Sequence, residues 1–124
     1  MRCPKCNCEM EKQIVSGIQV DRCSSCFGLW FDSGEIERLS TRKAAETIDI
    51  GDPALGDRVN VYDRYDCPQC RVPMIRMVDP AQTHIWFEKC GSCHGSFFDA
   101  GEFKDLATFA LSDLFKRLIT GERT

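Results

Sequence analysis

Eight of the nine cysteines fall into four Cys-x-x-Cys pairs, a spacing that is typical of metal-binding sites. Each pair can fold as a tight turn that points both sulfurs at one ion, and two pairs complete the four-thiolate tetrahedron that Zn²⁺ accepts. Sixteen residues separate the first two pairs and nineteen separate the last two, which lies within or at the upper end of the range for zinc sites. The sequence therefore predicts two structural zinc ions, one held by Cys3, Cys6, Cys23 and Cys26 and the other by Cys67, Cys70, Cys90 and Cys93.

Other chemistries use the same residue types. A secreted disulfide framework disagrees with the odd cysteine count and with the absence of a visible signal peptide. A redox pair would open a helix after a buried strand, and neither Cys3 nor Cys67 does so. Residues 90–94 match the c-type haem pattern, but Phe27 stands at the position equivalent to His94. Iron uses the same four thiolates and stays open as the alternative metal.

Few residues outside the eight ligands are candidates for chemistry. Cys8 is interpreted as a spare thiol, because Val72 takes its place in the second half. His84 and His94 have no counterparts in the first half and are interpreted as surface or turn residues. Since four cysteines fill every coordination position of each ion, we expect no catalytic residues and no enzyme activity. A thiol-dependent enzyme would have to use Cys8.

The elements that position the cysteines occur twice. From Cys26 to Leu39, seven of fourteen residues are identical to those from Cys93 to Leu106, which is far beyond chance and indicates a duplication. We predict a first zinc ribbon with a helix at residues 1–48, a linker at 49–64 and a second ribbon with a longer helix at 65–124. Gly51, Pro53 and Gly56 suggest that the linker is irregular, with a short extended piece near Val59 to Tyr62.

Each half is expected to fold as a β-hairpin, a third short strand and an α-helix. The hairpins are predicted at residues 14–20 and 74–88, and the third strands at 29–31 and 97–98. Asp32 with Glu35, and Asp99 with Glu102, fit the spacing of helix N-caps. The fold class is therefore a small, metal-stabilised α+β protein made of tandem zinc ribbons, each a β-hairpin plus knuckles followed by an α-helix.

The second predicted helix carries more apolar surface than one small ribbon can cover. Its stripe begins at Phe103, passes through Leu111 and Leu114, and ends before Gly121. Such a face is expected to pack on the other module, on the linker or on a second chain.

Charge argues against general binding to nucleic acid. The formal net charge is -3, and two four-thiolate zinc sites lower it by four to about -7. Arg38, Arg42 and Lys43 form a local basic patch. Trp30, Trp86 and Phe97 have rings that can stack on bases, but we interpret them as packing around the metal sites. No apolar run reaches the roughly 18 residues of a membrane span, so we expect a cytoplasmic protein without membrane partners.

The repeated string, with Cys-Pro-x-Cys followed by Cys-x-x-Cys-x-Gly-x-Trp/Phe-Phe-Asp-x-Gly-Glu-x-x-x-Leu, resembles a known family. It is similar to the transcription-factor-IIB-type zinc ribbon of small prokaryotic proteins described as transcription factor zinc-finger domains. The resemblance implies the ribbon fold and the eight cysteine ligands. Besides these cysteines it is carried by Pro4, Asp21, Gly28, Trp30, Asp32, Gly34, Glu35 and Leu39, and by Pro68, Glu88, Gly95, Phe97, Asp99, Gly101, Glu102 and Leu106.

These observations predict a zinc-binding, non-enzymatic protein-interaction or adaptor module. Its expected partner is another protein, or a second copy that associates through the C-terminal helix. The alternative is a nucleic-acid-binding or transcription-associated accessory protein, favoured by the ribbon type and the basic patch.

Overall fold

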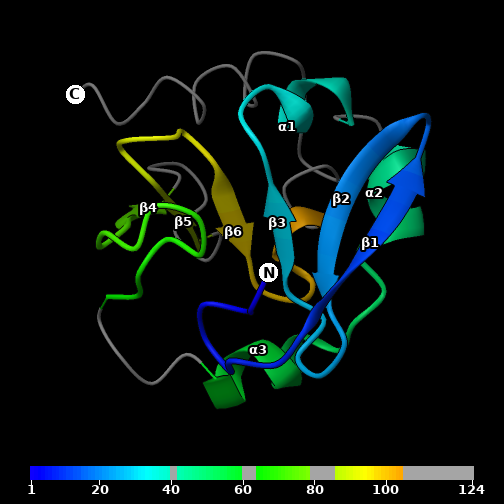
Figure 1. Cartoon of the computed structure of the whole chain (residues 1–124). Helices are drawn as coiled ribbons and strands as arrows, with labels where there is room; N and C mark the ends of the chain where they lie inside the picture. The colour runs from blue at the N-terminus through cyan, green and yellow to red at the C-terminus, as the bar shows by residue number, and fades with distance from the viewer. Residues whose placement is uncertain (40–41, 60–63, 79–85, 105–124) are drawn as a thin grey trace.

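One six-stranded antiparallel sheet, in the order β1-β2-β3-β6-β5-β4, forms the centre of the molecule (Figure 1). The computed structural model describes residues 1–39, 42–59, 64–78 and 86–104. The strands are β1 (Met10–Val15), β2 (Ile18–Cys23), β3 (Leu29–Phe31), β4 (Ile75–Val78), β5 (Trp86–Lys89) and β6 (Ser96–Phe98). The helices are α1 (Glu35–Arg38), α2 (Arg42–Ile48) and α3 (Pro53–Val59).

The predicted hairpin of the first half is confirmed. β1 and β2 pair in antiparallel register from Met10 opposite Cys23 to Val15 opposite Ile18. The two-residue turn between them has positive φ at both Ser16 (52°) and Gly17 (79°), as the twist of a tight hairpin requires. β3 then pairs with β2, and the second half repeats the arrangement with β4, β5 and β6.

The two halves meet at the centre of the sheet, where β3 pairs antiparallel with β6. In this register Trp30 lies opposite Phe97, and Leu29 lies opposite Phe98. The repeats are therefore related by an approximate twofold axis through this strand pair. The division of the chain at residues 48 and 64 stays a prediction.

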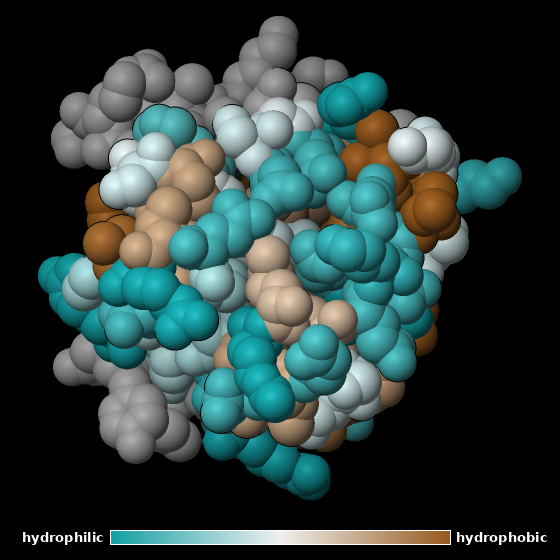
Figure 2. All heavy atoms as spheres, in the orientation of Figure 1, coloured by the Kyte–Doolittle hydropathy of each residue, from teal (hydrophilic) through white to brown (hydrophobic). Residues whose placement is uncertain are grey.

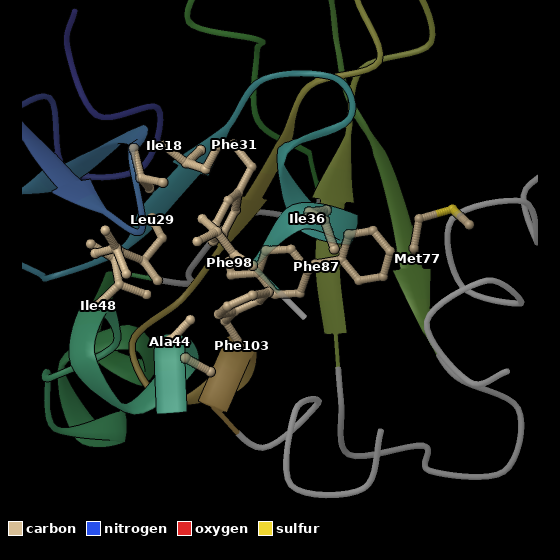
Figure 3. Close-up of a cluster of buried hydrophobic side chains, with 14 residues drawn as sticks. Ile18, Leu29, Phe31, Ile36, Ala44, Ile48, Met77, Phe87, Phe98 and Phe103 are labelled. Carbon is tan, nitrogen blue, oxygen red and sulfur yellow. The ribbon is translucent and has the colours of Figure 1, made fainter. Parts of the chain in front are cut away.

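Alternation along β3 and β6 separates two cores on opposite faces of the sheet. Leu29, Phe31 and Phe98 point to one face, where Phe87 stacks on Phe98 with ring centroids 4.7 Å apart. Figure 3 shows Ile48 and Ala44 of α2 covering this aromatic core. Trp30 and Phe97 point to the other face and join the cysteines in what we call the metal-side core.

The helical predictions need correction. Instead of one helix to Ile48, the first half has α1 and the separate α2; α1 ends at Arg38, and Leu39 after it leaves the helical conformation with φ -111°. In the second half residues 102–104 are helical. The rest of the predicted second helix, including Leu111 and Leu114, lies outside the described residues.

The predicted irregular linker contains α3. Pro53 occupies the first helical position, which suits its fixed φ and missing N–H, and the Asp52 carboxylate accepts a hydrogen bond from Ala54 N at 3.0 Å. Val59 thus ends a helix rather than starting a strand, while Val61 and Tyr62 lie outside the described residues. No helix in the part of the chain that the structure describes is long and apolar enough to cross a membrane.

Asp49, which follows α2, caps the helical turn at residues 102–104 in the second half. Its side chain is completely buried and accepts hydrogen bonds from Gly101 N and Lys104 N, both at 2.8 Å. The segment that follows is in close contact with the same region, because a Cβ atom on Gly101 would lie 2.7 Å from Pro53 Cγ. The predicted linker is therefore packed against the second half.

Candidate metal centres

Four short turns, which we call knuckles, carry the eight predicted ligands. Knuckle 1 (residues 3–6) precedes β1 and knuckle 2 (23–26) joins β2 to β3; knuckle 3 (67–70) precedes β4 and knuckle 4 (90–93) joins β5 to β6. The residue after each knuckle adopts the left-handed conformation, with φ between 61° and 63°. These residues are Asn7, Phe27, Arg71 and His94. His94 therefore has a conformational role that Phe27 fills in the first half.

The structure brings each predicted set of four cysteines together. Within each set the Sγ atoms lie within 4.8 Å of one another. The Sγ atoms of Cys3 and Cys26 are 3.7 Å apart, those of Cys6 and Cys23 are 3.3 Å apart, and those of Cys67 and Cys93 are 3.7 Å apart. A tetrahedral zinc–thiolate centre with bonds of about 2.3 Å has sulfurs about 3.8 Å apart. Both clusters therefore fit one zinc ion each without large rearrangement.

Backbone N–H groups donate hydrogen bonds to the cysteine sulfurs and so stabilise negative charge on them. Cys23 Sγ accepts hydrogen bonds from Ser25 N and Cys26 N, both at 3.4 Å. Cys67 Sγ accepts the equivalent bonds from Gln69 N at 3.4 Å and Cys70 N at 3.3 Å. Knuckle 4 repeats the arrangement around Cys90 Sγ. Hydrogen bonds to the charged form stabilise a thiolate, and zinc binds the thiolate.

Without an ion, the crowded thiols share their protons unequally. The hydrogen bond from Cys3 lowers the pKa of Cys26 to about 5, and the same contact raises the pKa of Cys3. Desolvation raises the pKa of Cys90, but hydrogen bonds from Cys93 N and Ser92 N outweigh it and bring that pKa to about 7. Each cluster is therefore ready to exchange protons for a cation.

The remaining cysteine stays outside both sets of four sulfurs. Cys8 is half-buried, and its thiol donates a weak hydrogen bond to Cys6 O at 3.8 Å. All nine cysteines are free thiols in the structure.

Packing accounts for two of the candidate base-stacking rings. Trp30 and Phe97 are completely buried in the metal-side core. A Cβ atom on Gly95 would lie 2.2 Å from Trp30 Cζ2, and one on Gly28 would lie 2.2 Å from Phe97 Cζ. Each ring therefore lies on the glycine that follows the opposite half's knuckle. The side chain of Trp86 lies outside the described residues.

A buried charge cluster was missed by sequence reasoning. Lys5, in knuckle 1, has a fully buried side chain whose Nζ lies 2.9 Å from Asp99 Oδ2 and 3.0 Å from Glu88 Oε1. The same Nζ lies 4.9 Å from the centroid of the Tyr65 ring, and Glu88 also pairs with Arg76 at 3.2 Å. The spacing of Asp99 and Glu102 predicts a helix cap and gives no sign of this ion pair.

The other half makes an equivalent but weaker contact. Gln69, the counterpart of Lys5 in knuckle 3, donates to Asp32 Oδ1 at 2.9 Å, and Trp30 Nε1 donates to the same oxygen at 3.2 Å. Asp32 therefore binds the opposite knuckle instead of capping α1, whereas Glu35 does bond back to Asp32 N at 2.8 Å. The repeat alignment could have indicated these two contacts together, because Lys5 is equivalent to Gln69 and Asp99 is equivalent to Asp32.

Between knuckles 1 and 3 lies an open groove of about 670 Å³. Pro4 and Pro68 contribute apolar surface, and Arg2 and Arg71 contribute exposed guanidinium groups. Asp66 is the one acidic residue among the described residues that line it. The face of the molecule in Figure 2 is covered mainly by hydrophilic residues, with hydrophobic ones in small patches.

Comparison with known proteins agrees with this geometry. A family model described as transcription factor zinc-finger matches residues 2–42 and 66–108, which together make up more than half of the chain. The two matched segments correspond to the two copies of the ribbon. No curated protein and no solved structure matched the chain.

Proposed function

Because the chain belongs to the transcription factor zinc-finger family, we propose that it is a non-enzymatic adaptor whose two zinc ribbons together hold a segment of a partner protein. The segment binds in the groove between knuckles 1 and 3. The zinc ions are structural: they fix the two knuckles that form the groove walls.

The groove is the observation that carries this proposal. Its volume of about 670 Å³ lies in the range of binding clefts. Pro4 and Pro68 are rigid, so little conformational entropy is lost when they contact a ligand. Both halves build the groove, which gives the duplication a purpose that one ribbon cannot serve.

Charge selects an acidic, extended segment as the occupant. Arg2 donates one hydrogen bond to Asn7 O at 3.0 Å and keeps further donors available. Arg71 is exposed at the opposite side of the groove, and arginine forks bind carboxylates in two-point contacts. The N–H groups of Gln69 and Cys70 donate hydrogen bonds to Cys67 Sγ and disperse part of its thiolate charge beneath the groove.

An enzymatic role finds less support. Four cysteines complete each metal shell and leave no position for water or substrate. Cys8, the thiol outside the shells, is half-buried and bonded to a backbone carbonyl. Neither arrangement offers a nucleophile with an adjacent base.

Nucleic-acid binding is the second candidate, and Arg38 and Lys43 are the observation in its favour, because both are exposed. They lie on two separate short helices, α1 and α2, instead of the single helix face that the sequence suggested. Because Trp30 and Phe97 are buried, their rings cannot stack on bases.

Site-specific crosslinking in the protein's own cells tests the proposal. A photoreactive phenylalanine analogue at Arg2 should crosslink to an acidic segment of one recurring protein, and nuclease treatment should leave the crosslink intact. The same analogue at Glu11, an exposed residue of β1 outside the groove, is the matched control.

Charge reversal at the groove completes the test. Arg71→Glu should abolish the crosslink from position 2, whereas Arg38→Glu should leave it unchanged. Crosslinks to nucleic acid that are lost in Arg38→Glu would replace the adaptor proposal with the second candidate. Equal capture from positions 2 and 11 would remove the groove as the binding site.

A further inference from the structure

We infer that the two metal centres load and release zinc as one cooperative unit. This inference concerns the coupling between the sites and does not depend on the partner proposed above. It follows from the way each knuckle is held by the opposite half of the chain.

Contacts cross the approximate twofold axis in both directions. Lys5 of knuckle 1 binds Asp99 and Glu88 of the second half. Gln69 of knuckle 3 binds Asp32 of the first half. A knuckle keeps its shape when its metal is bound, so losing either ion disorders a group on which the other half depends.

The aromatic rings of Trp30 and Phe97 also link the two metal centres. Gly28 O accepts a hydrogen bond from the ligand Cys23 N at 2.9 Å, and Gly95 O accepts one from the ligand Cys90 N at 2.9 Å. The rings of Phe97 and Trp30 press on these same two glycines from the opposite half. Cysteines of both centres therefore share one buried core, and neither centre can open without exposing part of the other's surroundings.

The crossing contacts differ in strength, so they do not contribute equally to the coupling. Lys5 is fully buried, and its loss would leave the Asp99 carboxylate buried; Asp99 Oδ1 already lacks a hydrogen-bond partner among the described residues. A buried charge without its partner is strongly destabilising. The bond from Gln69 to Asp32 is exposed and involves an uncharged donor, so losing it costs little. The Lys5 contact should therefore carry most of the coupling, and emptying either centre should weaken the other by the same factor.

Native mass spectrometry of the zinc-loaded full chain during stepwise chelation tests the coupling. Two independent equal sites would leave about half of the molecules with one ion when half of the zinc is gone, whereas tenfold coupling lowers that share to about a quarter. We expect a quarter or less. A one-ion population near half would overturn the inference.

Two kinds of variant test whether the coupling runs through the crossing contacts. Lys5→Met should raise the one-ion population towards half, whereas Lys12→Met, which removes an ion pair to Asp21 within the first half, should not. Cys6→Ser should speed zinc release from the second centre at least tenfold, and Cys70→Ser should likewise speed release from the first centre.

The cysteine variants decide the matter if Lys5→Met does not fold. A second centre that releases zinc at the wild-type rate in Cys6→Ser would contradict the inference. A first centre that releases zinc at the wild-type rate in Cys70→Ser would contradict it as well. Because these measurements need no partner protein, they are independent of the crosslinking test.

Discussion

The indole ring of Trp30 lies against Gly95, so closely that a Cβ atom at that position would approach Trp30 Cζ2 to 2.2 Å. Phe97 contacts Gly28 in the same way from the other half, at 2.2 Å from its Cζ atom. Glycine at these positions therefore allows the two ribbons to share one core.

Replacing either glycine should separate the halves. We expect Gly95→Ala to lower the free energy of unfolding by about 1–3 kcal/mol, the usual cost of forcing extra atoms into a packed core. Urea unfolding of the zinc-loaded chain measures this. Gly91→Ala is the matched control, because its nearest neighbour, Ile75 Cδ1, would be 3.8 Å away and surface changes usually stay within about 0.5 kcal/mol. Equal stability of both variants would show that the close approach is not required.

Asp49 should stabilise the second half from outside it. Asp49→Ala leaves the N–H groups of Gly101 and Lys104 without their acceptor, and the loss of a helix cap costs about 0.5–2 kcal/mol. Hydrogen exchange should be faster at these two amides than in the wild type. Asp52→Ala removes an exposed bond to Ala54 N in α3 and should leave both amides protected. Unchanged protection in Asp49→Ala would contradict this role.

Removal of metal should unfold the chain. Structural zinc contributes folding free energy directly, and modules of this size bury too little apolar surface to fold without help. Adding a strong chelator should abolish the near-ultraviolet circular dichroism of the buried aromatic residues, and returning zinc should restore it. Cobalt substitution with four-sulfur absorption bands would confirm the ligand type. A chelated chain that keeps its signal with free thiols would contradict two structural zinc sites.

The carboxyl group of Asp99 should titrate far above its ordinary range. Burial raises the pKa of Asp99 to about 6, against the opposing effect of Lys5. Because the folded-state pKa is above the ordinary value of 3.8, protonation of Asp99 favours folding, and this contribution is lost as the pH rises through 6. Carbon-13 NMR of the side-chain carboxyl groups measures the titration directly.

Lys5→Met gives the control for this assignment. Without the nearby cation the pKa of Asp99 should rise further, because the ionised form loses its closest stabilising charge. Lys12→Met, which acts on Asp21, should leave the Asp99 titration unchanged. An Asp99 titration near pH 4 in the wild type would show that water reaches the group.

The sequence by itself determined the metal sites and the repeated ribbon, because these depend on local spacing. Two sulfurs in a Cys-x-x-Cys turn point the same way, and a two-residue turn such as Ser16-Gly17 sets the register of its hairpin. The cysteine sets and the family were predicted for this reason. The prediction of one helix to Ile48 was wrong, since α1 ends at Arg38 and α2 is separate.

Only the tertiary structure decided how the halves combine. Asp32, Asp99 and Asp49 each have spacing or composition typical of caps or linkers, and their actual partners lie 37, 94 and 52 residues away in sequence. No local pattern encodes such contacts, because they arise when β3 and β6 pair and bring the two knuckles together. The physical reason is that the central rings of Trp30 and Phe97 are buried against glycines of the opposite half, a contact that no spacing within one half encodes.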